Sequence, residues 1–536
     1  MKPSYHPGTV ILVNPWYPIG ETPSPPLGLA YLAASLEEAG HRVVVLDYVV
    51  YPYSIDRLKA WIDRLAPDIV GVTAVTMNVN KALQVVRDVK AIAPQTVTVM
   101  GGPHATFAAE ETLWDCPELD IVVLGEGEDT IVRLAQSAAT SRSWADIPGI
   151  LYRHDERIVR TRPKDGFLDV NRLPQPARHL LALDRYRMLH MPITMTTSRG
   201  CPFQCIFCVG RKMVGAKVRY RSPQSVVDEM ETVAGYGFHQ INIADDLFTA
   251  NETHCIAICE EMRKRRLDIR WTSFARVDTV SLKVLKAMKE AGCTAVSFGM
   301  ESANANILKT CRKGITKQQI VEAVRMCSEA DIQAHGSFIL GLPGETPETI
   351  AETLAFGEEL KAMGVSFGFH LLAPFPGTRV REEREAYGIR ILSDNWDDYH
   401  ANRAIVETDW ADRHMMNAIV EEWENAFNAE LGRISDRMNS GEATDGERAL
   451  LTNLERTVWL YEMMMADVLE TIGALPEEPI ETAVQTLTER VLPFVRNATS
   501  PKLQAVLQTA VQKKDLVPIR QEDGIHWVWA KKETLS

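Results

Sequence analysis

The chain has 536 residues, of which 46% are hydrophobic and 24% are charged, so it can form several buried cores and is not disordered in composition. It has 58 Lys and Arg against 71 Asp and Glu, and this net charge of −13 argues against broad binding to nucleic acid. No secretory leader or apolar stretch of membrane-spanning length is visible, and its nine cysteines are too sparse for a disulfide framework, so we expect a cytoplasmic protein.

Residues 1–140 alternate short apolar runs with helical patterns. We expect strands at Val10–Val13, Arg42–Leu46, Ile69–Val72, Thr96–Met100 and Ile121–Leu124, and helices at Leu27–Glu38, Ile55–Leu65 and Val79–Ala93. This order predicts an α/β domain with a doubly wound parallel sheet, whose ligand lies at the carboxyl ends of the strands. Glycines at several of these ends would let a large ligand approach the backbone, although ordinary tight turns are an equal alternative.

Residues 141–192 are expected to form a linker, with a hairpin at Ile150–Tyr152 and Arg157–Thr161. From 193 to 394 the alternation resumes. Strands are expected at Ile193–Thr197, Gln240–Ala244, Ile269–Phe274, Ala295–Gly299, Gln333–Leu340 and Ser366–Leu372. Helices are expected between them at Pro223–Ala234, Glu252–Arg265, Ser281–Ala291, Lys317–Ala330 and Pro347–Met363. Repeated βα units of this length predict a parallel barrel or part of one, with active groups at the strand carboxyl ends.

Residues 395–536 show a different, mostly helical pattern. Helices are expected at Met415–Leu431, Glu447–Ile472 and Ile480–Val495, followed by a hairpin within Val517–Trp529. We interpret this region as a helical C-terminal domain that shapes the substrate cavity.

Three cysteines, Cys201, Cys205 and Cys208, follow the first expected barrel strand in a CxxxCxxC spacing. Three thiolates on one loop suit zinc or an iron–sulfur cluster. A closed zinc site needs a fourth ligand, and residues 193–238 hold no further cysteine or histidine. Three ligands on a four-iron cluster would leave one iron open to a reactant. The alternatives are a zinc site completed from a distance and three unrelated core thiols.

This motif, at the end of the first strand of a six-unit barrel, resembles the radical S-adenosylmethionine (SAM) superfamily. The resemblance implies a 4Fe–4S cluster on the three cysteines and a SAM molecule on its open iron. Phe207 matches the aromatic position near the adenine, and Asp245 and Asp246, in a DDxFT segment, match the residues near the SAM amino group. Further SAM contacts implied at the next strand ends are Arg276 for the carboxylate, Glu301 for the ribose, and Gly341 and Leu342 on the adenine side.

The front domain resembles the cobalamin-binding domain that precedes many radical SAM barrels. The residues that the resemblance places near cobalamin are Pro26, Leu27, Gly28, Thr73, Thr76, Gly101, Gly102, Gly125 and Glu126. The cobalt-binding DxHxxG signature is absent, because neither His41 nor His104 has an aspartate two positions before it. This departure implies base-off cobalamin without histidine ligation, or a front domain that has lost the cofactor.

The combined resemblance implies a cobalamin-dependent radical SAM C-methyltransferase. In such enzymes a 5′-deoxyadenosyl radical removes a hydrogen from a substrate carbon, which then takes a methyl group from methylcobalamin. The alternatives are an oxidative cyclase or rearrangement enzyme without methyl transfer, and a non-catalytic cobalamin or metal sensor. We expect a small-molecule or biosynthetic-intermediate substrate, an external electron donor and no nucleic acid.

The remaining cysteines argue against further clusters. Methylthiotransferases carry three extra cysteines in their front domain, whereas this front domain has only Cys116. No cysteine follows Cys327, which excludes a C-terminal auxiliary cluster on thiolates. Cys255 and Cys259, four residues apart on an expected helix, are interpreted as packed core thiols.

Overall fold

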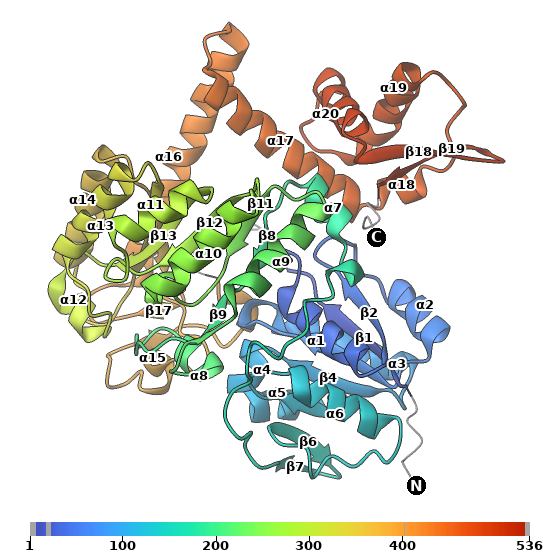
Figure 1. Ribbon diagram of the computed structural model, residues 1–536, viewed down its shortest axis with the longest axis horizontal. Coiled ribbons are helices and arrows are strands. Elements are labelled where there is room, and N and C mark those ends of the chain that lie inside the picture. The colour runs from blue at the N-terminus through green and yellow to red at the C-terminus, as the bar shows by residue number, and fades with distance from the viewer. Residues whose placement is uncertain (1–6, 18–22, 401, 531–536) are drawn as a thin grey trace.

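The computed structural model describes residues 7–17, 23–400 and 402–530. Its front sheet has the strand order β2-β1-β3-β4-β5-β6-β7, and the first five strands are parallel (Figure 1). These are β1 (Thr9–Asn14), β2 (Arg42–Asp47), β3 (Ile69–Thr73), β4 (Val97–Gly101) and β5 (Ile121–Val123). The order 2-1-3-4-5 is that of a doubly wound sheet, so the predicted fold class of this domain is confirmed.

Helices cover both faces of the front sheet. They are α1 (Leu27–Glu38), α2 (Ile55–Leu65), α3 (Val79–Ile92), α4 (Pro103–Phe107), α5 (Ala109–Asp115) and α6 (Glu128–Ala138). Residues of α1 and α6 share one buried cluster with Val10 and Leu12, whereas residues of α2 and α3 share another with Ile11 and Val13. Alternate side chains of one strand thus enter two cores, which explains why the strand is apolar throughout.

The expected hairpin forms, as β6 (Ile150–His154) and β7 (Arg157–Arg160), but its position differs from the prediction. β6 pairs antiparallel with β5, so the hairpin extends the front sheet instead of standing in a linker. The front unit therefore continues beyond residue 140. The local sequence pattern predicted the two strands of the hairpin. It could not predict their pairing with β5, because β5 lies elsewhere in the chain.

The second region is an open sheet of six parallel strands in the order β15-β14-β13-β12-β11-β8. The strands are β8 (Ile193–Met195), β11 (Gln240–Ile243), β12 (Arg270–Ala275), β13 (Cys293–Glu301), β14 (Gln333–Leu340) and β15 (Ser366–Leu371). The covering helices are α9 (Pro223–Gly235), α10 (Glu252–Lys264), α11 (Leu282–Glu290), α12 (Ala305–Thr310), α13 (Lys317–Glu329) and α14 (Pro347–Ala362). Since β8 and β15 end the order, the predicted partial barrel is confirmed.

Local caps fix where the barrel helices begin. A hydroxyl or amide oxygen accepts a backbone N–H of the first turn in each of the following: Ser222, Asn251, Ser281, Thr316 and Thr346. Such caps satisfy N–H groups that the helix itself cannot pair. They explain why the expected helix starts agree with the observed ones to within one residue.

The C-terminal region contains α16 (Arg413–Ser440), α17 (Asp445–Met465), α18 (Val468–Thr471), α19 (Ile480–Val491), α20 (Ser500–Gln512), and a hairpin of β18 (Leu516–Gln521) and β19 (Gly524–Trp529). The helix expected at 447–472 is broken at Asp467, which has a left-handed backbone with φ 46°. Asp467 Oδ2 pairs with Arg57 Nη2 of α2 at 2.5 Å, so the break lies at a contact with the front domain. The helix α20 was not predicted.

Besides the Asp467–Arg57 pair with the front domain, this C-terminal region contacts the barrel end and α7. Met416, in the first turn of α16, packs with Leu340 and Leu371 near the carboxyl ends of β14 and β15. The later part packs instead on α7 (Leu183–Met188), just before β8, where Arg456 Nη1 donates to the Met188 carbonyl at 2.7 Å. The substrate-shaping role expected for this region stays a prediction, and α16 is the part nearest the strand carboxyl ends.

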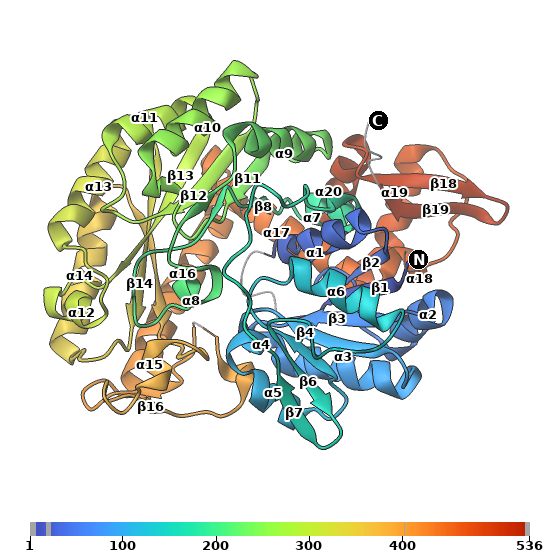
Figure 2. The same ribbon diagram turned by 60° about the horizontal axis from the view of Figure 1, so that its bottom comes forward.

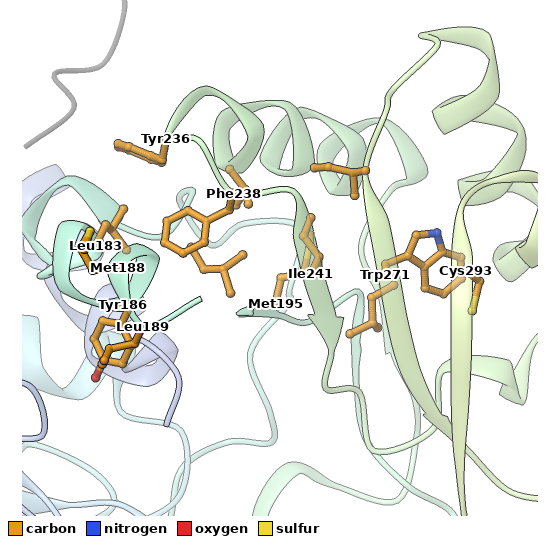
Figure 3. Close-up of a cluster of buried hydrophobic side chains, with 14 of the residues drawn as sticks. Leu183, Tyr186, Met188, Leu189, Met195, Tyr236, Phe238, Ile241, Trp271 and Cys293 are labelled. Atoms are coloured by element: carbon orange, nitrogen blue, oxygen red, sulfur yellow. The ribbon is translucent and has the colours of Figure 1, made fainter. Parts of the chain in front are cut away.

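One apolar cluster joins α7, the barrel and the C-terminal region. Figure 3 shows part of it, from Tyr186 of α7 and Leu189 just after this helix to Trp271 of β12. A second cluster joins the front domain to the barrel mouth, and it contains Ala105, Ile206 and Leu372. Figure 2 shows the front sheet beside the barrel. Within the described residues, no helix is long and apolar enough to cross a bilayer.

Candidate active site

The cysteine loop leaves β8 through the two-residue strand β9 (Ser198–Arg199), which pairs with β10 (Arg219–Tyr220). Gly200 lies at φ 124°, and a Cβ there would stand 2.5 Å from the Lys217 carbonyl oxygen. Only glycine allows this close return of the chain. The Cys201 N–H then donates to the Gly215 carbonyl at 3.0 Å, which closes the loop around the three sulfurs.

The three thiols lie close enough to influence one another's ionisation. Desolvation raises the pKa of each thiol, that of Cys208 to about 11. The Gly210 N–H donates to Cys208 Sγ at 3.3 Å, and Arg276 Nη1 lies 4.0 Å from Cys205 Sγ. These donors favour the thiolate forms that a metal requires.

The three thiolates of the loop are donors of the kind that a four-iron cluster takes. In the described part of the chain, no three His, Cys, Asp or Glu side chains are grouped to hold one metal ion. A four-iron cluster does not need such a grouping, because each thiolate binds a different iron. The arrangement therefore gives no support to the zinc alternative.

Asp245 and Asp246, at the end of β11, both face the cysteine loop. Asp245 is buried and accepts hydrogen bonds from Thr197 N–H, Thr197 Oγ1 and Ser198 Oγ, each at 2.6 Å. Asp246 is exposed, and its Oδ2 accepts from the Gly200 N–H at 3.3 Å. Asp245 thus holds the loop in place, whereas Asp246 has a carboxylate surface open to a ligand.

Arg276 follows β12 and is buried. Its guanidinium forms a two-point contact with Asp278, since Nε donates to Oδ1 and Nη2 to Oδ2, each at 2.9 Å. Nη2 also donates to the Lys313 carbonyl at 2.7 Å. Most of its donors are therefore already used within the chain.

Glu301 ends β13 with a left-handed backbone, at φ 63°. Such a conformation is costly for a residue with a side chain and is common at functional sites. The buried Glu301 carboxylate pairs with Lys313 Nζ at 2.6 Å. Sequence reasoning missed Lys313, because a single lysine after a short helix carries no motif.

Gly341 and Leu342 turn at the end of β14. Their N–H groups both donate to Glu345 Oε2, at 2.7 and 3.0 Å. Glu345 is fully buried, and burial raises its pKa to about 8. Sequence reasoning did not single out Glu345. Phe207 is half-buried and packs on the cluster that joins the two domains.

A cavity of about 280 Å³ lies at the carboxyl ends of the front-sheet strands. Its walls include these candidates: Gly28, Thr73, Gly101, Gly102, Gly125 and Glu126. Gly102 has φ 100°, and a Cβ there would meet the Ala74 carbonyl at 2.6 Å. Glycines form part of the cavity wall and apolar side chains such as Leu29, Leu32 and Val214 form much of the rest, which suits part of a large ligand such as cobalamin.

The other front-domain candidates lie outside this cavity lining, although all are described: Pro26, Leu27 and Thr76. Thr76 Oγ1 instead lies 3.3 Å from Nδ1 of the buried His104, whose pKa burial lowers to about 4. His41 Nδ1 accepts from the Gly8 N–H at 3.1 Å. No histidine lines the cavity in the described residues.

The cavity and the cysteine loop share a wall. Arg199, Met213 and Val214 of the loop region line the cavity together with the front-domain glycines. Arg199 Nη1 pairs with Glu126 at 3.1 Å and with Glu128 at 2.7 Å. Although burial opposes its ionisation, hydrogen bonds from Arg219 and the Leu168 N–H hold the pKa of Glu126 below its usual range. Glu126 therefore links the two domains.

Comparison with known families agrees with this division of the chain. The family described as B12 binding domain matches residues 21–135, and the Radical SAM superfamily matches residues 195–357. The matched ranges contain the cavity glycines and the cysteine loop, respectively.

Two curated relatives cover most of the chain. A protein named an uncharacterized methyltransferase, from Pyrococcus horikoshii, is 38% identical over 70% of this chain and 82% of its own length. The anaerobic magnesium-protoporphyrin IX monomethyl ester cyclase of Rubrivivax gelatinosus is 31% identical over 70% of this chain and 68% of its own.

A solved structure shares the fold over nearly the whole chain. It is the cobalamin-dependent S-adenosylmethionine radical enzyme OxsB, solved with aqua-cobalamin and S-adenosylmethionine bound. The similarity has a TM-score of 0.68 and covers 97% of this chain and 82% of that chain, at 19% identity. It supports the three-part architecture.

Proposed function

Since this chain belongs to the family of cobalamin-dependent radical SAM enzymes, we propose that it is a C-methyltransferase acting on a small molecule or biosynthetic intermediate. The observation that carries the proposal is the wall shared by the cysteine loop and the glycine-lined cavity. A substrate held between them would meet both cofactors without leaving the protein. When bound, the cluster and SAM supply a radical that removes a hydrogen atom, and cobalamin supplies the methyl group that replaces it.

The chain's own residues hold and orient these groups. Cys201, Cys205 and Cys208 would bind the cluster, and the exposed Asp246 would accept the SAM amino group. Glu301, placed by its left-handed backbone, would accept the ribose hydroxyls. The turn at Gly341 and Leu342, together with Phe207, would flank the adenine of SAM. Asp245, whose oxygens the loop already uses, acts by fixing that loop.

On the other side of the shared wall, the front-domain glycines would receive part of cobalamin. Because no histidine in the described residues lines the cavity, we propose that cobalamin binds base-off, without a histidine ligand. The ion pairs that Arg199 forms with Glu126 and Glu128 would hold the two sites in a fixed relative position. An external electron donor would reduce the cluster held by this loop, because reductive cleavage of SAM consumes one electron.

The test is anaerobic incubation of the reconstituted protein with methyl-labelled SAM, a reductant and candidate substrates. We expect 5′-deoxyadenosine, S-adenosylhomocysteine and label in the substrate. A protein that holds neither iron nor cobalt after reconstitution would overturn the proposal.

A second candidate is an oxidative cyclase without methyl transfer. The similarity to the Rubrivivax cyclase favours it, because that relative shares more than two thirds of its length with this chain. The same incubation separates the two functions. An oxidised product without label, formed with 5′-deoxyadenosine but without S-adenosylhomocysteine, would favour the cyclase.

A further inference from the structure

The contacts of Arg276 suggest a role different from a SAM carboxylate ligand. A planar guanidinium grips a free carboxylate best through two parallel N–H groups. In this structure that two-point contact is already made with Asp278, at 2.9 Å for both bonds. The Lys313 carbonyl takes a further bond from Nη2, at 2.7 Å. The Nε and Nη2 donors of Arg276 are therefore already bonded to groups of the chain itself.

The remaining nitrogen points to the cysteine loop. Arg276 Nη1 lies 4.0 Å from Cys205 Sγ, within the range of an N–H···S hydrogen bond. The guanidinium carbon lies 3.5 Å from the ring centroid of Phe203, two residues before Cys205. Arg276 thus touches the loop twice, once through a sulfur and once through an aromatic face.

Lys313 is a second buried cation in the same part of the molecule. Its Nζ pairs with Glu301 Oε1 at 2.6 Å, and its carbonyl accepts from Arg276. The end of β12 therefore brings one guanidinium N–H to a cysteine of the motif, whereas Glu301 pairs with the Lys313 ammonium.

We propose that Arg276 is a positioning residue for the cluster, which donates from Nη1 to the Cys205 thiolate and raises the reduction potential of the cluster. Hydrogen bonds to cluster sulfurs and nearby positive charge stabilise the more negative, reduced state. The inference rests on the proposed function only in that Cys205 binds a cluster. It changes the expected role of Arg276, from gripping SAM to preparing the cluster for one-electron reduction.

The test compares Arg276→Met with the wild-type chain after reconstitution. The reduction potential is measured without SAM, by a redox titration followed by electron paramagnetic resonance. We expect unchanged iron content, a more negative potential, and a SAM dissociation constant changed by less than about 3-fold. Arg276→Lys keeps the positive charge, so we expect its cluster reduction potential to lie between those of the wild-type chain and Arg276→Met.

Arg270→Met is the matched control, because Arg270 is exposed at the start of the same strand. It should leave the potential unchanged. If Arg276→Met fails to load iron, Phe203→Leu removes only the ring beneath the guanidinium. It should shift the potential in the same direction by a smaller amount.

Two results would overturn the inference. One is a potential that neither Arg276→Met nor Phe203→Leu changes. The other is a loss of SAM affinity of about 100-fold with an unchanged potential, as expected if two charge-assisted bonds to the SAM carboxylate were lost. A wild-type chain that forms no iron–sulfur cluster would instead overturn the proposed function, so the two failures are distinguishable.

Discussion

The two halves of the candidate active site are formed by different kinds of residue. On the barrel side, side chains form the site: three sulfurs, the carboxylates of Asp246 and Glu301, and two buried cations. On the front side, glycines such as Gly28 and Gly102 line one part of the cavity, and mainly apolar side chains such as Leu32 line the rest. Reactive chemistry needs particular functional groups, whereas enclosing part of a large ligand needs space. The two sites should therefore fail independently when they are mutated.

The largest expected effect is on the barrel side. Replacing Cys201, Cys205 and Cys208 together with Ala removes every thiolate of the loop, so we expect loss of the cluster iron and of 5′-deoxyadenosine formation. Cobalt content should stay near that of the wild-type chain, because the front cavity is separate. Metal analysis and product chromatography measure both. Persistent 5′-deoxyadenosine would contradict the assignment of the loop.

The complementary change is Gly28→Leu on the front side. No atom lies within 4 Å of a Cβ built at Gly28, so the fold has room for a side chain that would fill the cavity. We expect cobalt content to fall at least about 10-fold, which corresponds to about 1.4 kcal/mol of binding free energy, with iron unchanged. Gly235→Ala, also with open space but in α9, is the matched control. Loss of iron together with cobalt would show that the two sites are not independent.

The turn at Gly341 and Leu342 should make folding stability depend on pH, and this effect requires neither metal site. Burial raises the pKa of Glu345 to about 8, so the folded state keeps a proton that the unfolded chain loses near pH 4.5. Stability should therefore fall as pH rises from about 4.5 to about 8, by about 5 kcal/mol, and then level off. Glu345→Gln retains an oxygen for the Gly341 and Leu342 N–H groups and should lack this slope. Denaturant unfolding at several pH values measures it, and equal slopes in both proteins would refute the assignment.

The smallest expected effect concerns the link between the two halves. Arg199→Met leaves Glu128 without its ion-pair partner, while Glu126 keeps Arg219. We expect a loss of about 2 kcal/mol in the free energy of unfolding, because the Glu128 carboxylate loses a charge-assisted hydrogen bond. Both metals should still bind, but methyl transfer should slow more than 5′-deoxyadenosine formation. Equal slowing of both would indicate that Arg199 does not couple the two sites.

Much of the fold was predictable because its signals are local. Apolar runs and capping residues such as Ser281 and Thr346 fixed the strands and helix starts, and the βα alternation predicted both parallel sheets. The hairpin at 150–160 was found, but its pairing with β5 was not. The break at Asp467, just after α17, was missed as well, because no glycine or proline marks it in the sequence.

The sequence by itself determined the kind of chemistry, because a CxxxCxxC loop and an acidic residue at a strand end are consecutive features of the chain. It did not determine which candidates touch one another. Only the tertiary structure decided that Asp245 holds the loop, that Arg276 faces Cys205, and that Glu126 links the domains. The physical reason is that a charged side chain is assigned its role by its nearest buried partner. In this protein those partners are brought together from separate strand ends and separate domains.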